Sequence, residues 1–256
     1  MKVKWLPVII LPVFAQCQQP NAGTAHRPDP GTVTIAAIVD IPVPAGFTRL
    51  PAGDDSFTAW LRNIKVKKDP KVYLYNGRLK RNQDAQFAVL DIPVGTKDLQ
   101  QCADAVMRMR AEYLYQYNRF SEISFADNNG KKYNCPASAD RKNFERYLES
   151  VFAYCGTASL EKQLRRVPVF NNIQPGDVLI KGGFPGHAVM VMDVAADSSG
   201  RKIYLLAQSY MPAQDIHILK NPMYENLSPW YLADEADNMF IYSPEWTFSA
   251  KELRRW

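Results

Sequence analysis

The stretch Gln174–Gln214, QPGDVLIKGGFPGHAVMVMDVAADSSGRKIYLLAQSYMPAQ, decides the expected fold. Three short strands are expected in it, at 177–181, 187–194 and 203–209, because each is rich in apolar residues and is bounded by Gly, Pro or polar turns. The strand 187–194 is almost wholly apolar, which is typical of a strand buried on both faces. Short polar links between consecutive strands favour an antiparallel meander.

His187 stands at the entrance of the second strand, directly after the glycine-rich segment GGFPG at 182–186. Glycines there permit backbone conformations and close approaches that larger residues do not. A neutral imidazole at a strand end is well placed to act as a general base. Gln208, on the adjoining strand, is expected to hydrogen-bond one ring nitrogen and so to fix the tautomer. The alternative is a structural histidine at a sheet edge.

The first residues have the pattern of an export signal. Two lysines precede the apolar run Trp5–Phe14, which is too short to span a bilayer, so residues 1–16 are expected to be a signal peptide. Two endings fit the sequence, namely cleavage after Ala15 or lipidation of Cys17. Residues 17–31 are polar and Pro-rich, which indicates a tether. The protein is therefore expected to work in the periplasm, free or anchored to the outer membrane through lipid on Cys17.

Composition narrows the classes of partner. The net charge is +5, or 29 − 26 = +3 without the two lysines of the signal, which is too mild and scattered to predict a nucleic-acid partner. No glycine-rich phosphate loop is present, and the three histidines lack the spacing of a zinc site, so neither cofactor nor metal is expected. His217 alternates with Ile216 and Ile218 and is expected to face solvent from a strand.

Residues 32–256 are expected to form a single α+β domain, because no repeat or composition shift divides them. Residues 96–116 and 140–155 carry apolar side chains at helical spacing, and Asp140 is suited to cap the second helix. The tail from residue 221 is expected to wrap the core irregularly. Shorter helices are expected at 56–63 and 157–166, and further strands at 32–39, 72–75, 87–92 and 215–219.

Three cysteines remain after the tether. Cys102 is the first candidate for a nucleophile, because free amides and the macrodipole at a helix start favour a thiolate. It also lies on the apolar face of its helix, so a plain core cysteine is its alternative. Cys155 ends the apolar stripe of the helix 140–155, where the dipole opposes a thiolate, and is expected to be structural. Cys135 lies in a loop and is the natural candidate for a disulfide.

Cys102, His187 and Gln208 supply a nucleophile, a base and an orienting group in that order. This order resembles the papain-like superfamily. PGDVLI at 175–180 and GHAV at 186–189 resemble the PGD-strand-loop-GH-strand signature of its NlpC-type and CHAP-type cell-wall amidases. The resemblance implies a papain-like fold with N-terminal helices packed on an antiparallel sheet, His187 as the base and Gln208 as the third residue.

A second resemblance covers nearly the whole chain after the tether. The segments DLQQCADAVMRMRAEYLY at 98–115, PGHAVMVMDVA at 185–195 and LLAQSYMPAQDIHILKNP at 205–222 are similar to an uncharacterised family of exported Bacteroides-type proteins, often lipoproteins, whose domain has no known function. This resemblance implies export and a single domain, and it supplies no activity.

The sequence thus predicts an exported cysteine hydrolase that cleaves amide bonds in a peptide or in peptidoglycan. Tyr210, Trp230 and Tyr231 are candidates for lining its substrate groove, and core packing is their alternative. The competing classes are a non-catalytic envelope protein that binds glycan, peptide or a protein partner through the same cleft, and a purely structural lipoprotein. Contact between a thiol and the His187 ring separates the first class from the others.

Overall fold

The stretch that is predicted to form strands folds as an antiparallel meander. Its strands β6 (Val178–Lys181), β7 (His187–Asp197), β8 (Lys202–Gln208) and β9 (His217–Leu219) pair in this order. The expected strands are therefore confirmed, and β7 is longer than expected because its pairing with β8 continues to Ala196.

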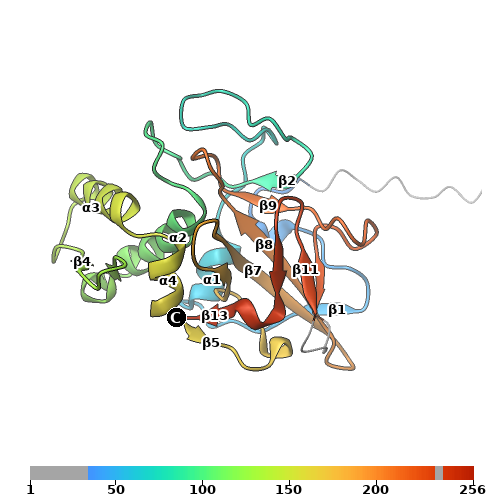
Figure 1. Cartoon of the computed structure of the whole chain (residues 1–256). Helices are drawn as coiled ribbons and strands as arrows, with labels where there is room; N and C mark the ends of the chain where they lie inside the picture. Colours follow the sequence, from blue (N-terminus) through green and yellow to red (C-terminus); the bar gives the residue numbers. More distant parts are fainter. Residues whose placement is uncertain (1–33, 234–238) are drawn as a thin grey trace, which may run out of the picture. The chain divides into compact units, whose positions relative to one another are not determined.

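The computed structural model describes residues 34–233 and 239–256, which belong to one compact unit, Thr34–Trp256 (Figure 1). The expected signal peptide (1–16), the tether (17–31) and Cys17 lie outside the described residues. None of the helices within the described ranges has the length and apolar character needed to cross a bilayer.

The meander is the centre of a nine-stranded sheet with the main order β2-β9-β8-β7-β6-β13-β5, in which each of the described pairings is antiparallel. In addition, β1 pairs with β7 and β10 with β8. The C-terminal segment does not wrap the core irregularly, because β13 lies between β6 and β5. The remaining strands of this sheet are β1 (Phe47–Arg49), β2 (Gln86–Val89), β5 (Arg165–Arg166), β10 (Tyr231–Ala233) and β13 (Leu253–Arg255).

Both faces of the central strands are buried, as the apolar run of β7 predicts. Ala188 and Met190 point into one hydrophobic cluster and Val189 and Val191 into another, which is the alternation of a strand. The first cluster lies between the sheet and the helices. The second is covered by the β11 (Phe240–Tyr242) and β12 (Thr247–Ser249) hairpin and the segment before β6.

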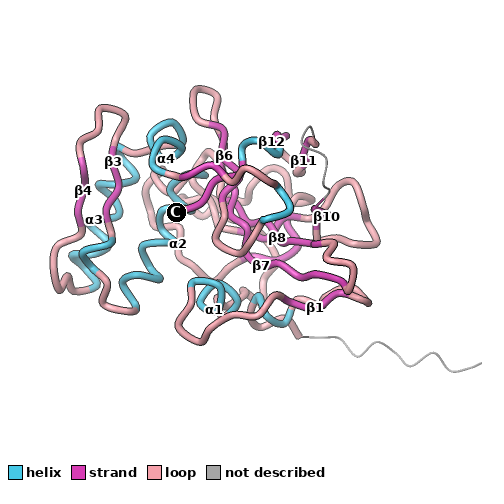
Figure 2. Tube along the Cα trace, turned by 90° about the horizontal axis from the view of Figure 1, so that it is seen from below, coloured by secondary structure: helices cyan, strands magenta, loops and turns pink. Residues whose placement is uncertain are grey.

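The helices α2, α3 and α4 lie on one side of the sheet, and α3 with the β3–β4 hairpin is farthest from it (Figures 1 and 2). α2 packs against β7 and β8, and α1 packs against β7. The bounds of these elements are α1 (Phe57–Arg62), α2 (Cys102–Gln116), α3 (Arg141–Tyr154), α4 (Thr157–Gln163), β3 (Ser124–Ala126) and β4 (Lys132–Asn134). The molecule is thus a mixed α+β fold with one large antiparallel sheet and few helices.

The N-terminal third departs most from expectation. The strand predicted at 32–39 is absent from its described part, where Ala37 makes an isolated bridge to Lys65 and a 3-10 turn follows at Ile38–Asp40. The strand predicted at 72–75 is reduced to two isolated bridges, because Tyr73 pairs across its own turn with Leu79. Local β propensity is not sufficient where no long partner strand is available.

The predicted helix at 96–116 begins six positions later, at Cys102. The backbone amide of Gln101 donates to Asp104 Oδ2 at 2.9 Å, which closes the first turn there. The other helix starts agree with the expected caps, since Ser56 accepts from the Ala59 amide and Asp140 from the Asn143 amide. Cys102 is therefore the first residue of α2.

A buried ion cluster holds the N-terminal segment to the sheet. Asp193 lies at a register shift between β7 and β8 and is fully buried. Its carboxylate accepts from Arg49 Nε at 2.6 Å and from Arg62 Nε at 2.8 Å, and the two arginines also donate to backbone carbonyls. This single carboxylate thus joins β1, α1 and β7.

Candidate functional site

His187 and Gln208 meet at one end of the sheet, where β7 begins and β8 ends. His187 Nε2 lies 2.8 Å from Gln208 Oε1, and both side chains are buried. An amide oxygen only accepts hydrogen bonds, so His187 Nε2 carries the proton and Nδ1 is the free nitrogen. The ring is enclosed by aromatic side chains, with ring centres at 4.7 Å for Tyr210, 5.3 Å for Trp246 and 5.8 Å for Phe248.

The thiol of Cys102 lies beside the entrance of β7. The backbone amide of Ala188, the residue after His187, acts on the Cys102 thiol together with the amides of Cys102 and Ala103, and all three lower its pKa. The first two amides of α2 are free to do so because the first turn of a helix leaves its N–H groups unpaired. The structure thus places Cys102 near the start of β7 and brings His187 into contact with Gln208.

Burial controls the resting charge of both groups. It raises the pKa of Cys102 to about 11, with a further increase from the Asp104 carboxyl, although the three backbone amides act in the opposite direction. Burial also lowers the pKa of His187 to about 4, against the opposing effects of Gln208 and Glu245. At neutral pH the Cys102 thiol and the His187 imidazole are thus both uncharged.

A cavity of about 480 Å³ opens in front of Cys102. Its rim carries exposed apolar side chains, with Phe184 95% exposed, Tyr154 65% and Met211 56%. Phe184 belongs to the glycine-rich loop that leads into β7. A Cβ atom on Gly186 would lie 2.5 Å from the Gly183 carbonyl oxygen, so only glycine fits this close backbone approach.

Cys155 lines the same cavity from the C-cap position of α3. Burial and the carboxyls of Asp127 and Asp104 raise the pKa of its thiol to about 11. Three backbone amides lower the pKa of Cys102 and so favour its thiolate, whereas the groups acting on the Cys155 thiol all oppose ionisation. Cys102 is consequently the better nucleophile candidate of the two.

Cys135, the expected disulfide candidate, is a free thiol, as are Cys102 and Cys155, and all three are buried. Cys102 is the first residue of α2, Cys135 directly follows β4, and Cys155 is the C-cap residue of α3. The expectation of a disulfide is thus not met in the part of the chain that the structure describes.

The three aromatic candidates for a substrate groove have different positions. Tyr210 is partly exposed and packs on the His187 ring. Trp230 is buried, and its indole nitrogen donates to the Pro42 carbonyl at 2.8 Å. Tyr231 is buried and its hydroxyl donates to the Lys220 carbonyl at 2.5 Å. Core packing therefore describes Trp230 and Tyr231, and only Tyr210 stays close to the candidate site.

Sequence reasoning missed two groups of this site. His217 does not face solvent as expected but is fully buried, because β9 lies between β8 and β2 in the sheet. It is paired with Gln208 across the two strands. Glu245, from the loop between β11 and β12, accepts from Gln208 Nε2 at 2.7 Å. The local sequence around Glu245 gives no sign of this role, because Glu245 and Gln208 are 37 positions apart in the chain.

The Asp of the PGD segment has a structural part in the molecule. Asp177 is fully buried and accepts from Arg255 at 2.6 and 2.7 Å. The preceding Gly176 has a φ of +89°, which favours glycine. This segment thus holds the C-terminal strand β13 in the sheet.

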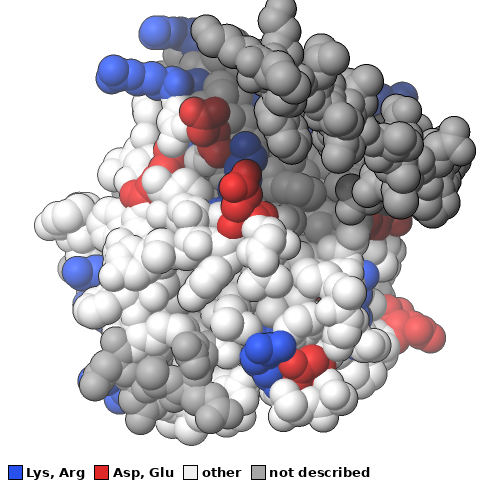
Figure 3. Space-filling model, turned by 90° about the vertical axis from the view of Figure 1, so that its right-hand side faces the viewer, with Lys and Arg blue, Asp and Glu red and all other residues white. Residues whose placement is uncertain are grey.

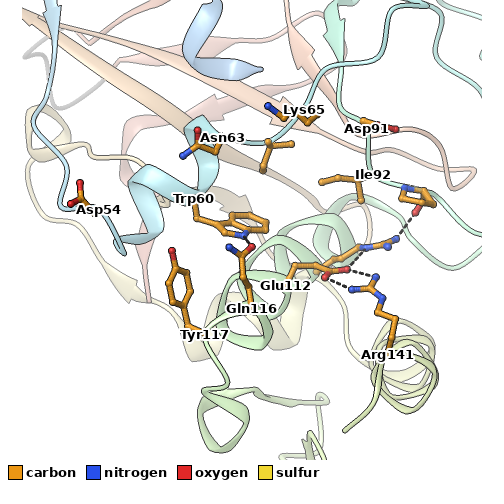
Figure 4. A pocket seen from close by; sticks show the side chains of 13 residues that line it. Asp54, Trp60, Asn63, Lys65, Asp91, Ile92, Glu112, Gln116, Tyr117 and Arg141 are labelled. Atoms are coloured by element: carbon orange, nitrogen blue, oxygen red, sulfur yellow. Dashed lines mark hydrogen bonds and ion pairs between the residues drawn. The ribbon is translucent and has the colours of Figure 1, made fainter. Parts of the chain in front are cut away.

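A second cavity of about 480 Å³ lies between α1, α2 and the chain near Lys65 and Asp91 (Figure 4). Trp60 donates to Gln116 on one wall, and the Glu112 carboxylate is bound by Arg141 on the other. Among the described residues that line it there is neither a cysteine nor a histidine. It therefore has no nucleophile of the kind that Cys102 provides.

The charges of the visible surface are mixed. On the face in Figure 3, basic and acidic side chains are few and stand close to one another, and they do not form a basic stripe. Within the described ranges, His, Cys, Asp and Glu form no group of three with the arrangement of a metal site.

A family model described as Domain of unknown function (4846) matches residues 39–136 and 132–255. The chain belongs to this family. The match spans almost all of the compact unit, which includes Cys102, His187, Gln208 and Glu245. The expected resemblance to a family without a known function is thereby confirmed. No curated protein and no solved structure matches the chain.

Proposed function

We propose that this protein is an exported cysteine amidase of papain-like topology that cleaves amide bonds in a peptide or a peptidoglycan stem. The observation that carries the proposal is that Cys102, the first residue of α2, and Gly186, directly before His187, line the same cavity. A thiol at a helix start, against a strand that begins with an oriented histidine, is the arrangement that thiol hydrolysis needs. The antiparallel sheet behind α2 supports the papain-like topology.

In the proposed reaction, His187 Nδ1 takes the proton of the Cys102 thiol while the sulfur attacks the substrate carbonyl carbon. The backbone amides at the start of α2 stabilise the oxyanion that forms. The C–N bond then breaks, and the imidazolium gives its proton to the leaving amine. Water attacks the resulting thioester, again with Nδ1 as the base, and the free thiol and a carboxylic acid are formed. Gln208 holds the ring throughout through Nε2.

Incubation with peptidoglycan fragments and with peptides tests this proposal. Release of free amines is expected from the wild type and is expected to disappear in Cys102→Ala. Cys155→Ala is the matched control, because it removes a buried thiol from the same cavity and is expected to keep the activity. Loss of activity in Cys155→Ala together with its retention in Cys102→Ala would contradict the assignment of the nucleophile.

A second candidate function is binding without turnover. The exposed apolar rim formed by Phe184, Tyr154 and Met211 around the cavity supports it, as does the high pKa of the Cys102 thiol. In that case glycan, peptide or a protein partner would occupy the cavity. Equal affinity of wild type and Cys102→Ala for a fragment that neither protein cleaves is the outcome that favours this function.

The N-terminal sequence supports export and lipid anchoring as part of the same proposal. We infer that the export signal 1–16 is removed and that Cys17 carries the lipid, as in the exported Bacteroides-type proteins that the sequence resembles. The mass of the mature N-terminal peptide measures this directly. A diacylglyceryl mass increment on Cys17 is expected, and a peptide that starts at Gln16 without lipid would replace anchoring by simple secretion.

A further inference from the structure

Behind Gln208 lies a buried ion pair that the proposed chemistry does not use directly. Lys80 Nζ donates to Glu245 Oε2 at 2.6 Å, and their side chains are 7% and 15% exposed. The same carboxylate oxygen accepts from Gln208 Nε2 at 2.7 Å, and Asn82 donates to the other oxygen at 3.2 Å. The chain thus places a charged pair directly behind the residue that orients His187.

The Gln208 amide has two possible orientations, which exchange its oxygen and its nitrogen. In the observed orientation the NH₂ group faces the Glu245 carboxylate and the oxygen faces His187 Nε2. The reverse orientation would bring the amide oxygen to 2.7 Å from a carboxylate oxygen, and two acceptors at this distance repel each other. Glu245 therefore permits only one orientation.

His217 favours the same orientation. Its Nδ1 lies 2.9 Å from the Asp215 carbonyl oxygen, which accepts only, so Nδ1 carries the proton and Nε2 is an acceptor. That Nε2 lies 3.4 Å from Gln208 Nε2, at the long end of a hydrogen bond. The contact to Glu245 is shorter and charge-assisted, and it is the stronger of the two.

We propose that Glu245, held by Lys80, is a positioning residue that fixes the Gln208 amide and thereby keeps the proton of His187 on Nε2 and leaves its Nδ1 unprotonated. The catalytic part of this role rests on the proposed function. The tautomer itself does not, because it is a property of the protein without substrate. The two buried histidines consequently carry opposite tautomers, Nε2–H in His187 and Nδ1–H in His217.

Nitrogen-15 NMR of the imidazole rings in the full chain tests this proposal at pH 7, where both buried rings are neutral. Wild type is expected to show a protonated Nε2 in His187 with at least about a tenfold preference, since a hydrogen bond to a charged group is worth that factor or more. A protonated Nδ1 in wild-type His187 would overturn the proposal, and this measurement needs no variant.

Two variants then identify Glu245 as the cause. Glu245→Gln keeps an acceptor for Gln208 and is expected to keep the His187 tautomer. Lys80→Met with Glu245→Met removes the whole pair, so that neither charge is left buried alone. In this double variant the Nε2 preference is expected to fall about tenfold, so that the Nδ1–H form becomes visible. An unchanged preference would overturn the role of Glu245. If the double variant does not fold, Glu245→Asp is measured instead, because the shorter side chain of aspartate moves the carboxylate away from Gln208 Nε2.

The matched control removes another ion pair of similar burial. Glu112 pairs with Arg108 on α2, and their side chains are 16% and 9% exposed. Glu112→Met with Arg108→Met is expected to leave the tautomers of both histidines unchanged. If the tautomers are as expected but the protein cleaves no amide, only the proposed function is contradicted. If the protein hydrolyses amides but His187 has the other tautomer, only this inference is contradicted.

Discussion

Replacement of His187 by alanine is expected to lower the rate of amide hydrolysis by about 10²- to 10⁴-fold, the usual contribution of a general base. The reason is that the Cys102 thiol has a pKa of about 11 and stays protonated at neutral pH, so the attack depends on a base that removes its proton. Steady-state kinetics on the substrate found for the wild type measures the effect. His26→Ala is the control, since it is the same substitution outside residues 34–256, and it is expected to leave the rate unchanged.

The dependence of the hydrolysis rate on pH is expected to follow the protonation of His187. His187 acts as a base only when it is neutral, and burial lowers its pKa to about 4. Activity is therefore expected to persist below pH 6.5 and to be lost as the pH falls through about 4. In a plot of kcat/KM against pH, the fall on the acid side reports the pKa of His187 in the free enzyme. A loss of activity already between pH 7 and 6 would mean that water reaches the ring in solution, which would contradict its burial in the structure.

Replacement of Asp193 by alanine is expected to lower the free energy of unfolding by about 3–5 kcal/mol, because it leaves buried charges without a partner. Asp193 is fully buried, and the side chains of Arg49 and Arg62 are only 21% and 12% exposed. Chemical denaturation monitored by tryptophan fluorescence measures the loss. Such a loss is a large fraction of the stability of an ordinary domain.

Glu149→Ala is the control for this prediction. Glu149 pairs with Lys97 on the surface, with side chains 46% and 61% exposed, and such a pair contributes about 0–1 kcal/mol. Equal effects of the two substitutions would mean that burial does not set the contribution of Asp193. A larger effect for Asp193 that disappears at high salt would be equally inconsistent, since buried pairs are poorly screened.

The central meander was predictable because its signal is local. The apolar run of β7 and the short polar turns on either side indicate both the strands and their antiparallel order. Adjacent strands also bring His187 and Gln208 to the same end of the sheet, so their contact follows from the predicted order. Helix α3 was predictable from its spacing and from Asp140 for the same reason.

The rest depends on contacts that are distant along the chain. β13 pairs with β6, and Glu245 reaches Gln208, through the folding of a segment without a recognisable pattern. His217 looked like an exposed residue because alternation is typical of a half-buried strand, yet neighbours cover both faces of β9. The position of Cys102 relative to His187 likewise required the packing of α2 against β7, which no spacing in the sequence specifies.

The place of β13 has a consequence for biosynthesis. Residues 253–255 insert between β5 and β6, and Arg255 neutralises the buried Asp177. A nascent chain that stops short of them would expose an open strand edge and an unpaired carboxylate, both of which promote aggregation. The sheet can therefore be completed only after residues 253–255 are available to pair with β5 and β6.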